Sequence, residues 1–483
     1  METPREDECR FIESTLSHIS TEVDALLAEK ARLSRRLNTL RSRTSVLPPE
    51  TLTAILEYAC LGQHERSALA SVCAHWYQVV HTTPSLWASV SLRYTRRNGV
   101  EFLLYHHRNA KCAPLSVELR ETQRNGRPAQ QESVIDPLFR TLLKDIAHDL
   151  RSLVFHGICP RLWSLIETYA RGDTGFSQLE DLTLLFLHTE RFQTKNTTML
   201  FSGSRLNNVT LKCGQGIAGI EGRLPLDNVT KFDGWGFSST YGMWILACCP
   251  KITTFKWEVS RWTQDFSDLS GLMALKSESP VVLPALETLI WKGGDVALAA
   301  SIMQHLEFPS LQLLDWEEQS PSRDSPDYPN FRKSFFSSMP KLRTLKVDFN
   351  ADTKEMVLPW LPSVENLEVR CLGREAGMLE FLLRRMASTV SNCLLPRLKC
   401  MTLLLRTTAP SELNALINML EWRRPRWFTR CALLEEFTLR IKGHDITEVW
   451  QEHHIDAFKR MVQGGLKLEI WEDKQAPGRL LSL

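Results

Sequence analysis

The sequence predicts a mixed fold: a long amino-terminal helix, a small bundle of three helices, and a curved α/β solenoid built on a parallel sheet. Apolar residues near the start recur with heptad spacing, three short amphipathic patterns follow, and a strand-like unit then repeats through the rest of the chain. With 483 residues, 43% of them apolar, the chain exceeds one compact domain and can bury a large core. We expect four parts, at residues 1–43, 44–92, 93–131 and 132–483.

Residues 1–43 have the pattern of a coiled-coil helix. Apolar side chains alternate at spacings of four and three for four heptads, interrupted only by Lys30: Ile12, Leu16, Ile19, Val23, Leu26, Leu33, Leu37 and Leu40. This seam fits self-association as well as folding back on its own protein, and the spacing favours neither. A run of arginines from Arg32 to Arg43 is interpreted as the solvated flank of the helix, rather than as a signal for nuclear import or nucleic-acid binding.

Three short amphipathic helices are predicted within residues 44–92. The first begins in the Leu-Pro-Pro-Glu sequence Leu47–Glu50, because proline is tolerated in the first turn, where amide protons have no partner in the helix. Its apolar face consists of Leu52, Ile55, Leu56 and Ala59. The second and third helices are marked by Leu69, Val72, Cys73, Trp76 and Val80, and by Thr83, Pro84, Leu86 and Trp87.

This segment resembles the F-box, and specifically the F-box-like domain common in mushroom-forming fungi, which also has a long helix directly before the box. It matches the family's Leu-Pro-Pro-Glu opening, Val-Cys-x-x-Trp centre and Thr-Pro-x-Leu-Trp close, at Leu47–Glu50, Val72–Trp76 and Thr83–Trp87. It departs from the family in having Ala74 and His75 where Arg-Arg or Arg-Lys is common, a change off the apolar face. The alternative is that these residues are the core of an unrelated three-helix unit.

The resemblance implies docking on a Skp-type adaptor, and through it on a cullin. Carried over position by position, the family's motif implies that the following residues pack the box or meet the adaptor: Leu47, Pro48, Leu52, Ile55, Leu56, Val72 and Trp76. Their spacing alone does not decide which of them face inward.

From Leu150 onward a unit of the form Leu-x-x-Leu-x-apolar recurs at intervals of roughly 20 to 40 residues. Its copies begin at Leu150, Leu179, Leu206, Ile252, Leu286, Leu311, Leu342, Val364, Leu398 and Leu434. Helical patterns are predicted at Pro137–Ile146, Leu162–Tyr169, Ala297–Leu306, Met378–Met386, Glu412–Leu420 and Ile455–Val462. Strands that alternate with helices predict a parallel sheet. The domain resembles a degenerate leucine-rich-repeat domain, in which nearly every copy lacks the Asn or Cys expected after the third apolar position. Irregular α/β folding that only echoes the repeat is the alternative.

Polar residues that alternate with the apolar ones are expected on the open face of this sheet. The candidates for binding a target protein are Lys256, Glu258, Lys346, Glu368, Arg370 and Thr438. An ordinary solvated sheet fits the same pattern. Two polar stretches, Glu121–Gln131 and Glu317–Asn330, are expected to be a connection and a surface loop.

Catalysis finds no support in the sequence, so we expect a protein that is not an enzyme and needs no cofactor or metal. Nucleophile-elbow, phosphate-loop, zinc-protease and dinucleotide motifs are absent, and the 12 cysteines include no C-x-x-C pair. Free thiols in a reducing compartment are the simplest account of these cysteines. His453 and His454 are interpreted as surface residues. A net charge of +2 argues against a nucleic-acid partner, and neither a secretory signal nor a membrane segment is recognised.

The sequence therefore favours a substrate-receptor subunit of a Skp-cullin-F-box type ubiquitin ligase, in the cytoplasm, the nucleus or both. The F-box-like segment would bind the adaptor, and the repeat domain would bind a target protein that the sequence does not identify. The alternative is a coiled-coil and repeat scaffold for protein interactions with no ligase role.

Overall fold

The computed structural model describes residues 4–41, 47–59, 63–94, 96–120, 132–171, 175–187, 199–213, 223–259, 281–293, 306–317, 335–348, 361–371, 378–387, 394–406, 409–423, 431–442, 450–473 and 479–480. The predicted connection at 121–131, nearly all of the predicted loop at 317–330 and nearly all of the predicted helix at 297–306 lie outside the described residues. The chain divides into two compact units. The amino-terminal unit comprises residues 1–157, 164–180 and 201–204, and the carboxyl-terminal unit comprises 158–163, 181–200 and 205–483.

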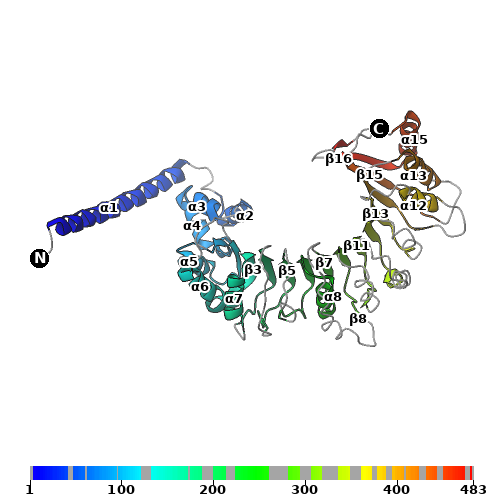
Figure 1. Ribbon diagram of the computed structural model, residues 1–483. Coiled ribbons are helices and arrows are strands. Elements are labelled where there is room, and N and C mark those ends of the chain that lie inside the picture. The colour runs from blue at the N-terminus through cyan, green and yellow to red at the C-terminus, as the bar shows by residue number, and fades with distance from the viewer. Residues whose placement is uncertain are drawn as a thin grey trace. The chain divides into compact units, whose positions relative to one another are not determined.

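The long amino-terminal helix predicted by the heptad spacing is confirmed. Helix α1 (Pro4–Arg41) is 38 residues long and continuous (Figure 1). Its carboxyl-terminal half contacts the helical bundle, where the guanidinium of Arg35 lies 4.3 Å from the ring centre of Tyr77. The apolar seam itself is exposed.

The helical bundle has one more break than the spacing predicts. Its elements are α2 (Pro49–Ala59), α3 (Gln63–Ala70), α4 (Ala74–Thr82) and the short 3-10 helix η2 (Pro84–Trp87). The stripe from Leu69 to Val80 therefore does not lie on one continuous helix. Cys73 has extended backbone angles, and its sulfur accepts the amide proton of Trp76 at 3.5 Å, so a new helix starts there.

The amino-terminal unit continues directly from the bundle into three strands that pair in parallel. Its elements are β1 (Ser89–Arg93), α5 (Gly99–Ala110), β2 (Leu115–Arg120), α6 (Glu132–Arg140), the π-helix η4 (Thr141–Asp145), the 3-10 helix η5 (Ala147–Asp149) and β3 (Leu150–Ile158). Strand β2 pairs in parallel with both β1 and β3. The region expected to connect bundle and repeats thus holds a helix and a strand of its own.

The carboxyl-terminal unit is dominated by a parallel sheet whose strands follow one another in chain order (Figure 1). Its strands are β4 (Asp181–Phe186), β5 (Asn208–Lys212), β6 (Lys231–Trp235), β7 (Thr254–Glu258), β9 (Thr288–Lys292), β11 (Leu313–Glu317), β12 (Thr344–Asp348), β13 (Asn366–Cys371), β14 (Cys400–Leu405), β15 (Glu436–Lys442) and β16 (Lys467–Asp473). The last strand, β17 (Arg479–Leu480), pairs antiparallel with β16. A separate two-stranded sheet joins β8 (Val281–Val282) to β10 (Leu306–Glu307). The predicted mixed α/β class with a large parallel sheet is confirmed.

Four further helices follow the predicted patterns closely: α7 (Pro160–Tyr169), α12 (Met378–Met386), α13 (Pro410–Trp422) and α15 (Glu452–Gln463). Helix α8 (Ser239–Cys248) was not predicted. The interpretation of His454 as a surface residue is wrong. Its side chain is buried, Nδ1 accepts the Gln451 amide proton at 3.2 Å, and Nε2 lies 3.1 Å from Oδ1 of Asn414. His454 therefore caps the start of α15.

Apolar rows in register form the core of the carboxyl-terminal unit. Trp257, Trp291 and Trp316 occupy equivalent positions on neighbouring strands, with ring centres 6.4 and 6.1 Å apart. Gly234 takes the place of the apolar side chain on β6, because a Cβ there would lie 2.1 Å from the indole of Trp257. Because β6 has glycine at a position where the other strands have an apolar side chain, the repeat pattern in the sequence did not predict this strand.

Most described cysteines are free, among them the exposed Cys9 and Cys112. Cys431 differs from the expectation of free thiols, because it is disulfide-bonded.

Candidate functional site

The structure separates the residues implied by the F-box resemblance into buried and accessible groups. Leu52 and Leu56 are completely buried and form the core of the bundle. Leu47, Val72 and Trp76 are half-buried, whereas Pro48 and Ile55 are exposed. The motif is therefore not one surface, and only its accessible members are available to a partner.

Helix α2 carries a second stripe that faces away from the core. Thr51, Ala54, Ile55 and Tyr58 are exposed and lie at helical positions i, i+3, i+4 and i+7, so they share one face. The exposed fraction is 45% for Ile55 and 91% for Tyr58. We call these four residues the α2 outer face. Tyr58 was not among the residues predicted from the sequence, although its spacing of three from Ile55 was a usable signal.

The start of α2 is held in place by the segment where the sequence departs from the family pattern. A ring nitrogen of His75 lies 3.1 Å from the carbonyl oxygen of Leu47. The hydroxyl of Ser85 donates to Oε1 of Glu57 at 2.5 Å, which joins η2 to α2. These contacts orient α2 without using its outer face.

A buried arginine that the sequence analysis missed holds the end of the bundle. The guanidinium of Arg66 donates to the carbonyl oxygens of Leu86 and Ser89, the latter at 3.0 Å, and lies 5.8 Å from the ring centre of Trp87. Trp87 in turn donates its indole N–H to the carbonyl oxygen of Val80 at 2.7 Å. Arg66 was not recognisable in the sequence, because its acceptors are backbone atoms 20 and 23 residues away.

His106 on α5 completes this cluster under η2. Its Nδ1 lies 3.3 Å from the carbonyl oxygen of Trp87, and its ring centre is 5.2 Å from that of Trp87. Burial, with a further contribution from the positive charge of Arg66, lowers the pKa of His106 to about 4. The imidazole is therefore neutral at physiological pH. Through the contact of His106 with Trp87, α5 packs against the bundle.

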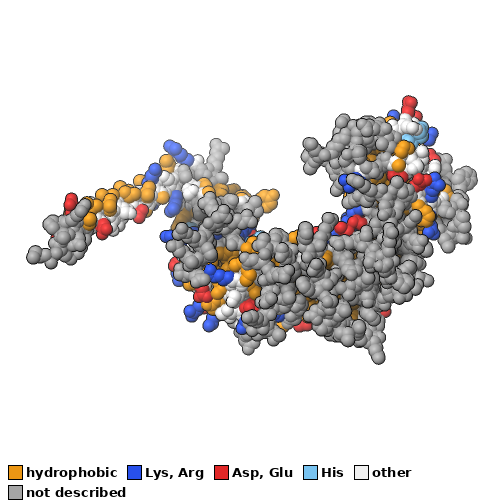
Figure 2. Space-filling view, in the orientation of Figure 1, with side chains coloured by type: hydrophobic (Ala, Val, Ile, Leu, Met, Phe, Trp, Pro, Cys, Tyr) orange, Lys and Arg blue, Asp and Glu red, His pale blue; other side chains and the backbone are white. Residues whose placement is uncertain are grey.

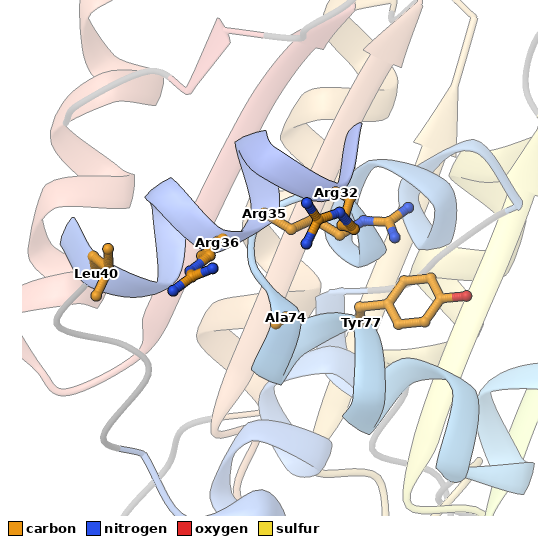
Figure 3. Close-up of a pocket in the computed structure, with 6 residues that line it drawn as sticks. All are labelled: Arg32, Arg35, Arg36, Leu40, Ala74 and Tyr77. Atoms are coloured by element: carbon orange, nitrogen blue, oxygen red, sulfur yellow. The ribbon is translucent and has the colours of Figure 1, made fainter. Parts of the chain in front are cut away.

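A shallow pocket of about 500 Å³ lies between the last turns of α1 and the start of α4 (Figure 3). Its lining consists of Arg32, Arg35, Arg36, Leu40, Ala74 and Tyr77. The arginines make the site basic, although Arg32 is paired with Glu29 at 2.6 Å, and Leu40 adds an apolar side chain at its edge. Such a surface suits an acidic partner segment.

The predicted target-binding residues lie on the half-exposed face of the carboxyl-terminal sheet, where most of them pair with charges on adjacent strands. Lys256 lies 3.5 Å from Asp233, and Lys346 lies 2.9 Å from Glu368. Glu258 and Thr438 occupy the same face, and Thr438 is in register with Thr402 and Glu469.

Arg370 is more deeply buried than Lys256, Lys346 and Glu368, and it contacts two carboxylates. It lies 2.5 Å from Asp315 and also forms an ion pair with Asp348. Burial raises the pKa of Asp348 to about 6, with a further increase from Glu317 and Asp315 that the guanidinium of Arg370 does not offset. This part of the face therefore changes its charge near pH 6.

The comparison with protein families agrees with the amino-terminal assignment. Residues 44–93 match the model of the F-box-like family, which confirms the predicted segment at 44–92 as F-box-like. No curated protein matches the chain. Within the described parts of the chain, every helix is too short or too polar to span a membrane.

Proposed function

We propose that this protein is a substrate-receptor subunit of a Skp-cullin-F-box type ubiquitin ligase. Its F-box-like bundle binds a Skp-type adaptor, and through it a cullin, while the carboxyl-terminal unit binds the target protein. In this role the chain performs no chemistry itself, and it works in the cytoplasm or the nucleus, where the target is modified.

The α2 outer face is the observation that carries the proposal. An F-box-like bundle that buried all its apolar residues would have nothing to offer an adaptor, but here Ile55 and Tyr58 stay exposed while Leu52 and Leu56 fill the core. Tyrosine is enriched among the positions that dominate protein interfaces, and Ile55 extends the apolar surface beside Tyr58.

The carboxyl-terminal unit is proposed to be a degenerate leucine-rich-repeat-like solenoid. Its parallel strands pair in chain order, and the repeated apolar positions, such as Leu289, Leu314 and Leu345, share one register and are buried. The opposite face presents Lys256, Glu258, Lys346, Glu368, Arg370 and Thr438 as the proposed target-binding residues. Because most of these charges are already paired, we expect a target to be selected by charge pattern more than by apolar contact.

Calorimetric titration of the purified full-length chain with a purified Skp-type adaptor tests the proposal. Tyr58→Ala and Ile55→Ala should each weaken binding by about 10-fold or more, because each removes an apolar contact from the centre of the interface. Val462→Ala on α15 is the matched control, since Val462 is also an exposed aliphatic residue on a helix. Failure of the unmodified chain to bind adaptor at micromolar concentration would overturn the proposal.

One observation favours the alternative of a non-ligase scaffold. The apolar seam of α1 is exposed along its whole length, as expected of a helix whose task is to bind another protein. The same titration separates the two functions, because a scaffold predicts no adaptor binding and no effect of Tyr58→Ala.

A further inference from the structure

Helix α1 exposes a long apolar stripe. Eight seam residues, each between 46% and 79% exposed, define it: Ile12, Leu16, Ile19, Val23, Leu26, Leu33, Leu37 and Leu40. Figure 2 shows the stripe running along α1, with acidic side chains toward the amino-terminal end and basic side chains toward the other. A stripe with a strict seven-residue period fits another helix with the same period.

We propose that α1 pairs with the α1 helix of a second copy of this chain, and that the two helices run antiparallel. The proposal is independent of the adaptor, because the stripe and the α2 outer face are different surfaces. Two features of α1 indicate both the partner helix and its direction. They are the distribution of charge along α1 and the position of Lys30 in the seam.

The two ends of α1 carry opposite charge. Residues 4–24 hold six acidic and two basic residues, a net charge of −4, whereas residues 25–41 hold one acidic and five basic residues, a net charge of +4. A parallel pair in register would place like charge beside like charge along the whole contact. An antiparallel pair places the acidic end of each helix beside the basic end of the other, which is favourable.

The seam residues match in the antiparallel direction over their full length. With seam positions aligned end to end, Leu16 lies opposite Leu33 of the second copy, and Val23 lies opposite Leu26 of the second copy. Lys30 then lies opposite Ile19 of the second copy, over which its aliphatic stem can extend to water. In the parallel alignment, Lys30 would face the same lysine across the seam, which is unfavourable.

The basic pocket of Figure 3 lies where the second helix would begin. In the antiparallel alignment, Cys9 comes opposite Leu40 of the second copy, and Glu13 comes level with Arg36, one of the arginines that line this pocket. The side chain of Glu13 is exposed and carries the charge that the pocket suits. The pocket therefore supports the same partner and the same direction as the stripe.

The oligomeric state of the full-length chain, without adaptor, is the first test. Sedimentation velocity at tens of micromolar should give a dimer, and Leu26→Asp in the seam should shift the mass to the monomer. Phe11→Asp is the matched control, because Phe11 is 72% exposed on the same helix but lies off the seam, so its dimer should persist. A monomeric unmodified chain, or equal effects of the two variants, would overturn the proposal.

Disulfide trapping decides the direction. Two variants are prepared, one with Leu16→Cys and one with Leu33→Cys, and both also carry Cys9→Ser and Cys112→Ser. When the two are combined and oxidised, a mixed cross-link should form. Neither variant should cross-link alone. Cross-linking of each chain with itself would show a parallel pair instead.

Raising the salt from about 0.05 to about 0.5 M should weaken an antiparallel dimer, because screening reduces the attraction between opposite ends. Tighter association at the higher salt concentration would contradict the antiparallel arrangement.

Discussion

The bundle of the amino-terminal unit and the sheet of the carboxyl-terminal unit reach stability by different means. Beside its apolar core of Leu52 and Leu56, the bundle is held by three side chains that each occur once, Arg66, Trp87 and His106. Their hydrogen bonds join α3, α4, η2 and α5, and Arg66 also reaches the first residue of β1. The sheet depends on apolar positions that recur from strand to strand, such as Trp257 and Trp291.

Their outer surfaces differ in the opposite sense. The bundle exposes the apolar α2 outer face, whereas the sheet exposes charges that are paired across strands, such as Lys346 with Glu368. The proposed adaptor-binding surface therefore lies on a few short helices that are fixed by individual hydrogen bonds. The proposed target-binding surface lies on an extended sheet that is fixed by repeated apolar contacts.

The largest expected effect tests how regular the sheet must be. Gly234→Ala places a Cβ about where the indole of Trp257 already lies, so the strand or the ring has to move. We expect the free energy of unfolding of the carboxyl-terminal unit to fall by about 3 kcal/mol or more, measured by denaturant titration. Gly99→Ala on α5 is the control, since its Cβ would meet Leu138 at an ordinary 3.6 Å. Equal effects of the two variants would mean that the sheet accommodates the ring elsewhere.

A slightly smaller effect is expected from the buried arginine of the bundle. Arg66→Ala leaves the carbonyl oxygens of Leu86 and Ser89 without their donor, which should destabilise the amino-terminal unit by about 2 to 3 kcal/mol. Arg32→Ala is the control, because Arg32 pairs with Glu29 on the exposed surface of α1 and its loss should leave stability almost unchanged. Limited proteolysis of the bundle, followed over denaturant concentration, measures both. A bundle that resists protease equally in the two variants would show that Trp87 alone suffices.

The smallest effect is a pH dependence of opposite sign in the two units. In the amino-terminal unit, the pKa of His106 is lowered to about 4, so below its unfolded pKa the unfolded chain takes up the proton first. The contribution of His106 to the free energy of unfolding is therefore fully present above about pH 6.5. It is lost as pH falls, by about 2 kcal/mol between pH 7 and pH 5. His106→Gln should remove this dependence of the unfolding free energy on pH, whereas His18→Gln on the exposed side of α1 should leave it unchanged. A slope unchanged by His106→Gln would assign it to other groups.

In the carboxyl-terminal unit, Asp348 contributes the reverse. Its pKa is raised to about 6 from an ordinary value of 3.8, so the folded state holds the proton more tightly between these values. Its contribution to stability is present at low pH and is lost as pH rises through this window. Asp348→Asn should flatten that part of the stability curve of the carboxyl-terminal unit and leave the amino-terminal unit unaffected.

Periodicity in the sequence by itself determined the long helix α1, the short amphipathic helices of the bundle and most strands of the large sheet, whereas the F-box-like identity of the bundle came from its motifs. These features depend on which residues lie on one face of a helix or strand, and that is a local property of spacing. Helix α12, for example, spans the predicted residues Met378–Met386 without correction.

Only the tertiary structure decided which members of a motif face outward and which polar groups are buried. Leu52 and Ile55 lie three residues apart on α2, and it is the packing of α4 and η2 that buries one and leaves the other exposed. Gly234 and Arg66 fall in the same class, because a tryptophan on a neighbouring strand and carbonyl oxygens beyond the next helix explain them. Contacts between residues far apart in the chain leave no periodic signal, so no reading of local spacing could have found them.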